Sequence, residues 1–64
     1  MKIKMNKLYG LENSVAYYRS IGDCFDFVST IDLATELTED EANEVMKYKD
    51  TYCKQYGASS MEVI

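Results

Sequence analysis

The most reactive side chains in this chain of 64 residues are two thiols, Cys24 and Cys53. A four-ligand zinc site needs further cysteine or histidine, and the chain contains no histidine and no third cysteine. The sequence also places no evident activating group beside either thiol, as a nucleophilic cysteine requires. We therefore expect no metal and no cofactor, and we expect both cysteines to be reduced and to pack as small apolar groups.

Carboxylates are the other groups that could do chemistry, because two of them facing each other can act as general acid and base. The chain has eleven acidic residues, but such a pair must lie across a cleft. A domain of this length buries little of its surface and scarcely encloses a cleft. The missing histidine also removes the commonest general base. We predict that the protein is not an enzyme.

The charge is distributed very unevenly along the chain. The net charge is −4, yet the segment from Ile21 to Met46 holds eight acids and no base over 26 residues. Turn, capping and helix N-terminal positions explain about five of these acids, whereas a protein surface ordinarily mixes both signs. The segment predicts a negative face that attracts a basic partner, and the simpler alternative is a solvated acidic surface. The residues assigned to the face are Asp23, Glu36, Glu39, Asp40 and Glu44.

Basic residues are too few and too scattered to predict direct nucleic-acid binding. Lys2, Lys4 and Lys7 lie near the start of the chain and are offset by the acidic segment. Single-strand binders pair stacked aromatic rings with a basic groove, and no such groove is predicted here. The spacing of the aromatic residues instead favours a place in the core.

A helix is predicted from about Glu39 to Tyr56. Thr38 and Glu41 have the spacing of a capping box, in which each side chain accepts the backbone N–H of the other residue. One amphipathic stripe follows, with Lys49 at a position where an apolar residue is expected, and Gly57 is placed to end the helix. The residues of the stripe are Ala42, Val45, Met46, Tyr52, Cys53 and Tyr56.

A β-hairpin is predicted from Val15–Ile21 and Cys24–Ile31, joined by the two-residue loop Gly22-Asp23. If Ile21 faces Cys24, an opposite-charge pair and an aromatic pair fall opposite each other, which supports this register. The pairs are Arg19 with Asp26 and Tyr18 with Phe27. The face expected to pack on the helix carries Ala16, Tyr18, Phe25, Phe27 and Ile31.

Two weaker strands are expected to flank these elements. Residues 2–9 alternate lysine with apolar residues at their start, which suits an edge strand, and residues 61–64 could return to the sheet after the helix. Residues 32–37 are expected to form one helical turn or a plain connector. The predicted fold is α+β: a three-stranded antiparallel meander, one amphipathic helix and a short C-terminal strand (β-β-β-α-β), with the helix packed on one small sheet.

Composition predicts one folded domain over residues 1–64. Hydrophobic residues make up 47% of the chain and the net charge is modest, which argues against disorder. No stretch has the roughly 18 apolar residues of a membrane span, and no apolar run follows the basic start as in a secretion signal. We expect a cytoplasmic protein with no membrane partner.

Size, acidity and the hairpin followed by residues 32–42, DLATELTEDEA, give the chain a class-level resemblance. It resembles the very small acidic cytosolic proteins encoded by phages and mobile elements, among them anti-CRISPR proteins that inhibit Cas nucleases. These proteins share no common sequence, so no functional residue is carried over. The resemblance implies a non-enzymatic inhibitor that binds a nuclease or its guide complex.

Two functions of different classes follow. The first is an inhibitor that uses the acidic face to block a nucleic-acid-binding protein with a basic surface. The alternative is a self-associating accessory or structural module of a phage or bacterium, a homodimer formed through an edge strand or through the hairpin face that carries Val15, Tyr17 and Val28.

Overall fold

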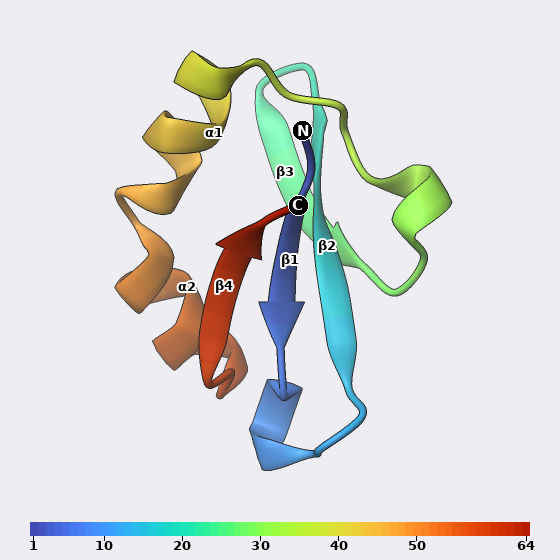
Figure 1. Cartoon of the computed structure of the whole chain (residues 1–64), viewed down its shortest axis with the longest axis vertical. Coiled ribbons are helices and arrows are strands. Elements are labelled where there is room, and N and C mark those ends of the chain that lie inside the picture. The colour runs from blue at the N-terminus through green and yellow to red at the C-terminus, as the bar shows by residue number, and fades with distance from the viewer.

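A computed structural model describes the whole chain, residues 1–64, as one antiparallel sheet covered on one face by two helices (Figure 1). The strands are β1 (Ile3–Asn6), β2 (Val15–Ile21), β3 (Cys24–Val28) and β4 (Ser60–Val63), in the spatial order β3-β2-β1-β4. Helices α1 (Glu39–Met46) and α2 (Lys49–Tyr56) precede β4. The α+β class is confirmed, and the element order is β-β-β-α-α-β.

The β2–β3 hairpin has the predicted register. Ile21 pairs with Cys24, Arg19 with Asp26 and Tyr18 with Phe27. Gly22 in the two-residue loop has φ +58°, a left-handed conformation that glycine adopts without strain. Pairing partners and turn chemistry are local properties of the sequence, which explains why they could be predicted.

The prediction that the second hairpin strand reaches Ile31 is wrong. The strand β3 ends at Val28, and Ile31–Leu33 form a short 3-10 helix, η2. After Val28 the chain leaves the sheet and crosses β2, reaching the edge of β2 that does not pair with β3. There the Thr35 N–H donates to the Tyr18 carbonyl over 3.1 Å. This connector lies on the face of the sheet away from the helices (Figure 1).

The first strand is not an edge strand, contrary to prediction. The strand β1 lies between β2 and β4 and pairs with both in antiparallel fashion. Ile3 and Met5 are fully buried on the helix-covered face. The alternating Lys2 and Lys4 project from the opposite face, so their charges do not oppose strand pairing.

The single predicted helix is two helices, separated at Lys47 and Tyr48. The break falls where the apolar stripe is interrupted, since Lys49 occupies the position at which an apolar residue would have held a continuous helix against the sheet. The start and the end are as predicted. Both hydrogen bonds of the capping box are present, and Gly57 follows Tyr56 with φ +60°.

The core lies between the helices and the sheet. Aromatic rings extend it toward β3: the Phe27 ring centroid lies 5.6 Å from that of Tyr52 and 5.0 Å from that of Tyr56. Phe25 and Ile31, which were also assigned to the packed face, are 47% and 41% exposed. The eight buried residues are Ile3, Met5, Leu8, Ala16, Tyr18, Leu37, Ala42 and Met61.

Candidate functional site

The acids of the segment from Ile21 to Met46 divide into two groups. Four are engaged by another group of the chain: Asp26 by Arg19, Glu36 by the Met1 amine, Glu44 by Lys47, and Glu41 in the capping box. The other four side chains are exposed and have no cationic nitrogen within 4.0 Å. They are Asp23, Asp32, Glu39 and Asp40.

Two of the uncompensated acids, Glu39 and Asp40, stand in the first turn of α1. The cap fixes this turn, because the Thr38 hydroxyl accepts the Glu41 N–H over 3.2 Å and the Glu41 carboxylate accepts the Thr38 N–H over 2.9 Å. Leu37, just before the cap, is buried and anchors the turn to the core. The partial positive charge of the helix N-terminus favours carboxylates here without neutralising them.

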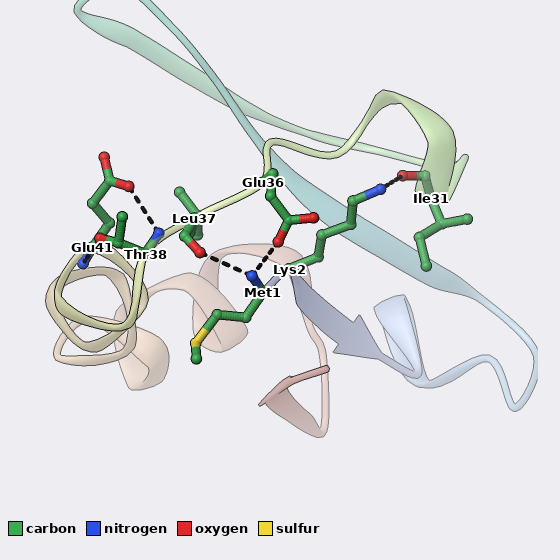
Figure 2. Close-up of polar contacts among 7 residues, drawn as sticks. All are labelled: Met1, Lys2, Ile31, Glu36, Leu37, Thr38 and Glu41. Carbon is green, nitrogen blue, oxygen red and sulfur yellow. Dashed lines mark hydrogen bonds and ion pairs between the residues drawn. The ribbon is translucent and has the colours of Figure 1, made fainter.

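Glu36 lies two residues before the cap and is tied to the start of β1 (Figure 2). The Met1 amine donates to the Glu36 carboxylate and, over 2.8 Å, to the Leu37 carbonyl. These contacts hold the pKa of Glu36 below its ordinary value, mainly through the hydrogen bond from the amine. The side chain remains exposed on its outer side.

Glu44 belongs to the same helix but is neutralised locally. Its carboxylate accepts a hydrogen bond from the Lys47 ammonium over 2.9 Å, and this contact raises the pKa of Lys47. Asp40 lies one turn earlier on the same side of the helix and has no such partner. The free negative charge of α1 is therefore concentrated in its first turn.

Asp23 is brought to the same end of the molecule by the fold. The turn between β2 and β3 and the start of α1 both lie at the top of Figure 1, with the connector that carries Glu36 passing between them. We call Asp23, Glu36, Glu39 and Asp40 the acidic end. Segments far apart in sequence thus bring acidic residues to the same end of the molecule.

Tyr17 does not join this group. It lies on β2 opposite Val28, half-buried on the face of the sheet away from the helices. Val15 and Val28, the other members of the predicted hairpin face, are also half-buried. The connector and η2 lie over this side of the sheet, held in part by a hydrogen bond from the Lys2 ammonium to the Ile31 carbonyl over 3.1 Å.

The two cysteines are free thiols that lie in different environments. Cys24 is exposed next to the hairpin turn, and Cys53 is half-buried on α2, where burial raises the pKa of its thiol. Cys53 borders a hollow of about 250 Å³ that is lined largely by polar side chains of α2 and the segment leading into β4. No three histidine, cysteine, aspartate or glutamate side chains are grouped so that they could hold a metal ion.

One exposed feature was not assigned from the sequence. Ile21 and Phe25, at the tip of the hairpin, are 63% and 47% exposed although both are large and apolar. The hydrophobic pattern of the hairpin marks them as strand residues. The pattern does not indicate that β3 lies at an edge of the sheet, because the position of β3 depends on which strand β1 pairs with.

No protein-family model, curated protein or solved structure matches this chain. Neither helix is long and apolar enough to cross a lipid bilayer.

Proposed function

We propose that this protein is a non-enzymatic, cytoplasmic inhibitor that binds a basic surface of a nucleic-acid-binding protein through its acidic end. The first partner class that we propose is a CRISPR-Cas nuclease bound to its guide RNA. The observation that carries the proposal is the exposure of Asp23, Glu39 and Asp40 at one end of the fold, with no cationic nitrogen within 4.0 Å of any of their carboxylates.

Uncompensated charge at one end has a direct physical consequence. Carboxylates that already hold an internal cation offer little attraction to a partner, whereas free ones create a local negative potential. Such a potential raises the rate of association with a positively charged surface and disfavours contact with nucleic acid itself. Glu36 adds to this potential only in part, because the Met1 amine is bound to it.

The size of the fold suits a blocking role. The chain measures 28 × 23 × 21 Å along its principal axes, small enough to enter a nucleic-acid channel. A nuclease that holds a guide–target duplex does so with basic side chains aimed at phosphates. Carboxylates at a rigid helix start can occupy such positions, and the capping box keeps that start in one conformation.

Inhibition of DNA cleavage tests this function. Purified Cas nuclease–guide RNA complexes of several types are assayed with the wild-type chain, with the double variant Glu39→Lys/Asp40→Lys, and with the control Glu12→Lys/Asp50→Lys. Both variants change the net charge equally, but only the first alters the acidic end. We expect cleavage to be blocked by the wild type and the control and not by the first variant. Equal inhibition by all three proteins, or by none, would contradict the proposal.

A further inference from the structure

The outer edge of β3 is free for pairing with another strand. In the β2–β3 register the residues that exchange hydrogen bonds with β2 are Cys24, Asp26 and Val28. The N–H and C=O groups of Phe25 and Phe27 therefore point outward, and no loop or cap of the chain bonds to them. An unpaired edge of this kind is a template for a second strand.

Large apolar side chains lie at this edge of the sheet. Phe25 and Ile21 are 47% and 63% exposed, and a shallow hollow of about 60 Å³ lies among Ile21, Cys24, Phe25 and Asp26. The ring of Phe25 already packs on Tyr52 of α2, with the centroids 5.3 Å apart. An incoming strand at this edge would thus extend an existing aromatic cluster.

The opposite edge of the sheet, formed by β4, is different. Its outward-facing groups belong to Met61 and Val63. The hollow beside it is lined mainly by polar and charged residues, among them Lys49 and Asp50. Val63 and Ile64 at this edge are 42% and 46% exposed, against 63% for Ile21 and 47% for Phe25, so an added strand buries more apolar surface at β3.

We infer that β3 pairs in antiparallel fashion with β3 of a second copy of this chain, forming a twofold-symmetric dimer. The register that overlaps all five residues places Asp26 opposite Asp26 of the second copy, Phe25 opposite Phe27, and Cys24 opposite Val28. In this register Val28 of the second copy lies over Cys24, beside the hollow. The aromatic clusters of the two copies also become continuous.

Charge at the centre of the pairing is balanced in this register. Two opposed aspartates would ordinarily repel each other, but each Asp26 already accepts two hydrogen bonds from Arg19, from Nε over 2.9 Å and from the second guanidinium nitrogen over 2.5 Å. The four side chains at the axis therefore carry no net charge. The edge is therefore self-complementary, because its aromatic side chains face each other and its central charges are balanced, as a twofold pairing of two copies requires.

The dimer is independent of the proposed partner binding. Antiparallel pairing keeps both pairs of helices on one face of an eight-stranded sheet and sends the two hairpin turns in opposite directions. The two acidic ends then lie apart and remain exposed. The salt dependences also differ: salt screens the repulsion between two chains of charge −4 and strengthens the dimer, whereas it weakens binding to a basic partner.

A disulfide tests the register directly. In this register residue 26 of one copy faces residue 26 of the other as a non-hydrogen-bonded pair. The two Cα atoms then lie about 4.5 Å apart, within reach of a disulfide. Residue 24 of one copy faces residue 28 of the other, so the two residues 24 are four positions apart, about 13 Å along the strands. Because Asp26→Cys alone would leave two unpaired Arg19 guanidinium groups at the axis, the test variant is Asp26→Cys/Arg19→Gln with Cys24→Ser and Cys53→Ser. The control is Cys53→Ser alone, which retains Cys24. We expect the test variant to form covalent dimer under mild oxidation at least about tenfold faster. Equal rates, or no dimer from either protein, would overturn the register.

The unmodified chain supplies a second test. Sedimentation of the wild type up to about 1 mM is expected to show a dimer that grows with salt, because a short edge pairing gives weak association. Amide exchange at Phe25 and Phe27 is expected to slow with concentration, while exchange at Val63 does not change. A strict monomer at every salt, or protection at Val63 instead, would overturn the proposal.

Discussion

Arg19 and Asp26 face each other across the β2–β3 hairpin, and the guanidinium donates two hydrogen bonds to the carboxylate, from Nε over 2.9 Å and from the second nitrogen over 2.5 Å. This two-point contact holds the pKa of Asp26 below its ordinary value and raises that of Arg19, in each case mainly through the side-chain hydrogen bonds. It also removes Asp26 from the acids that are free to attract a partner, although Asp26 lies close to the acidic end in sequence.

The pKa of Asp26 is the first prediction. Arg19→Gln removes the cation, so the pKa of Asp26 should rise toward that of an ordinary aspartate. Because the folded-state pKa is lowered, the pair stabilises the folded chain above the ordinary aspartate pKa, and this contribution is lost as the pH falls through the lowered value. NMR titration of the aspartate carboxyl carbons measures the shift. An Asp26 pKa unchanged by Arg19→Gln would show that the contact is not formed in solution.

The capping box gives a prediction for the stability of α1. Thr38→Ala removes the hydroxyl that accepts the Glu41 N–H, and the free energy of unfolding should fall by about 1 kcal/mol. Thr30 is a matched control, because it occupies the N-cap position of η2 without making a side-chain cap bond. Urea unfolding of Thr30→Ala should therefore give almost the wild-type stability. Equal losses for the two variants would show that the capping bond contributes nothing.

Gly57 is required for two reasons that a control can separate. Its φ is +60°, and a Cβ at this position would lie 3.2 Å from the Tyr9 Cα atom. Gly22 has nearly the same φ, +58°, but open space around it. We expect Gly22→Ala to destabilise the fold by about 1 kcal/mol through backbone strain, and Gly57→Ala by about 2 kcal/mol or more because the Tyr9 backbone must also move. Thermal unfolding measures both, and equal losses would exclude a contribution from the Tyr9 contact.

The centre of the core is expected to tolerate little loss of volume. Met5 is fully buried on β1, so Met5→Ala should cost about 3 kcal/mol through lost burial and the cavity left behind. That is a large part of the stability of a domain of this size, on the order of 3–10 kcal/mol. Leu33→Ala is the control, since Leu33 is 55% exposed, and it should change stability by less than about 0.5 kcal/mol. A small effect of Met5→Ala in urea unfolding would contradict the central position of β1.

The parts of the fold that depend on neighbouring residues could be predicted from the sequence. The hairpin register follows from turn chemistry and from the Arg19–Asp26 spacing, and the start of α1 follows from Thr38 and Glu41. The position of β1 could not be predicted, because alternating lysines suit either an edge strand or an internal strand with one open face. The division of the helix at Lys47 and Tyr48 also depends on packing against the sheet.

The candidate site shows the same limit. The acidic segment is evident in the sequence, and the pairing of Glu44 with Lys47 follows from their spacing along a helix. The contact between Glu36 and the Met1 amine joins groups 35 residues apart, so only the fold shows that Glu36 is engaged. For the same reason the separation of Tyr17 from the acids becomes visible only when the two faces of the sheet are known.

The central claim, that the acidic end binds a basic surface, is tested most directly by binding to Cas nuclease–guide RNA complexes at low and high salt. Fluorescence titration compares the wild type with Glu39→Lys/Asp40→Lys and with the control Glu12→Lys/Asp50→Lys. We predict that the first variant binds on the order of tenfold more weakly than the wild type and that the control does not, with the difference shrinking at high salt. Affinities that are equal for the two variants, or binding that does not depend on salt, would contradict the claim.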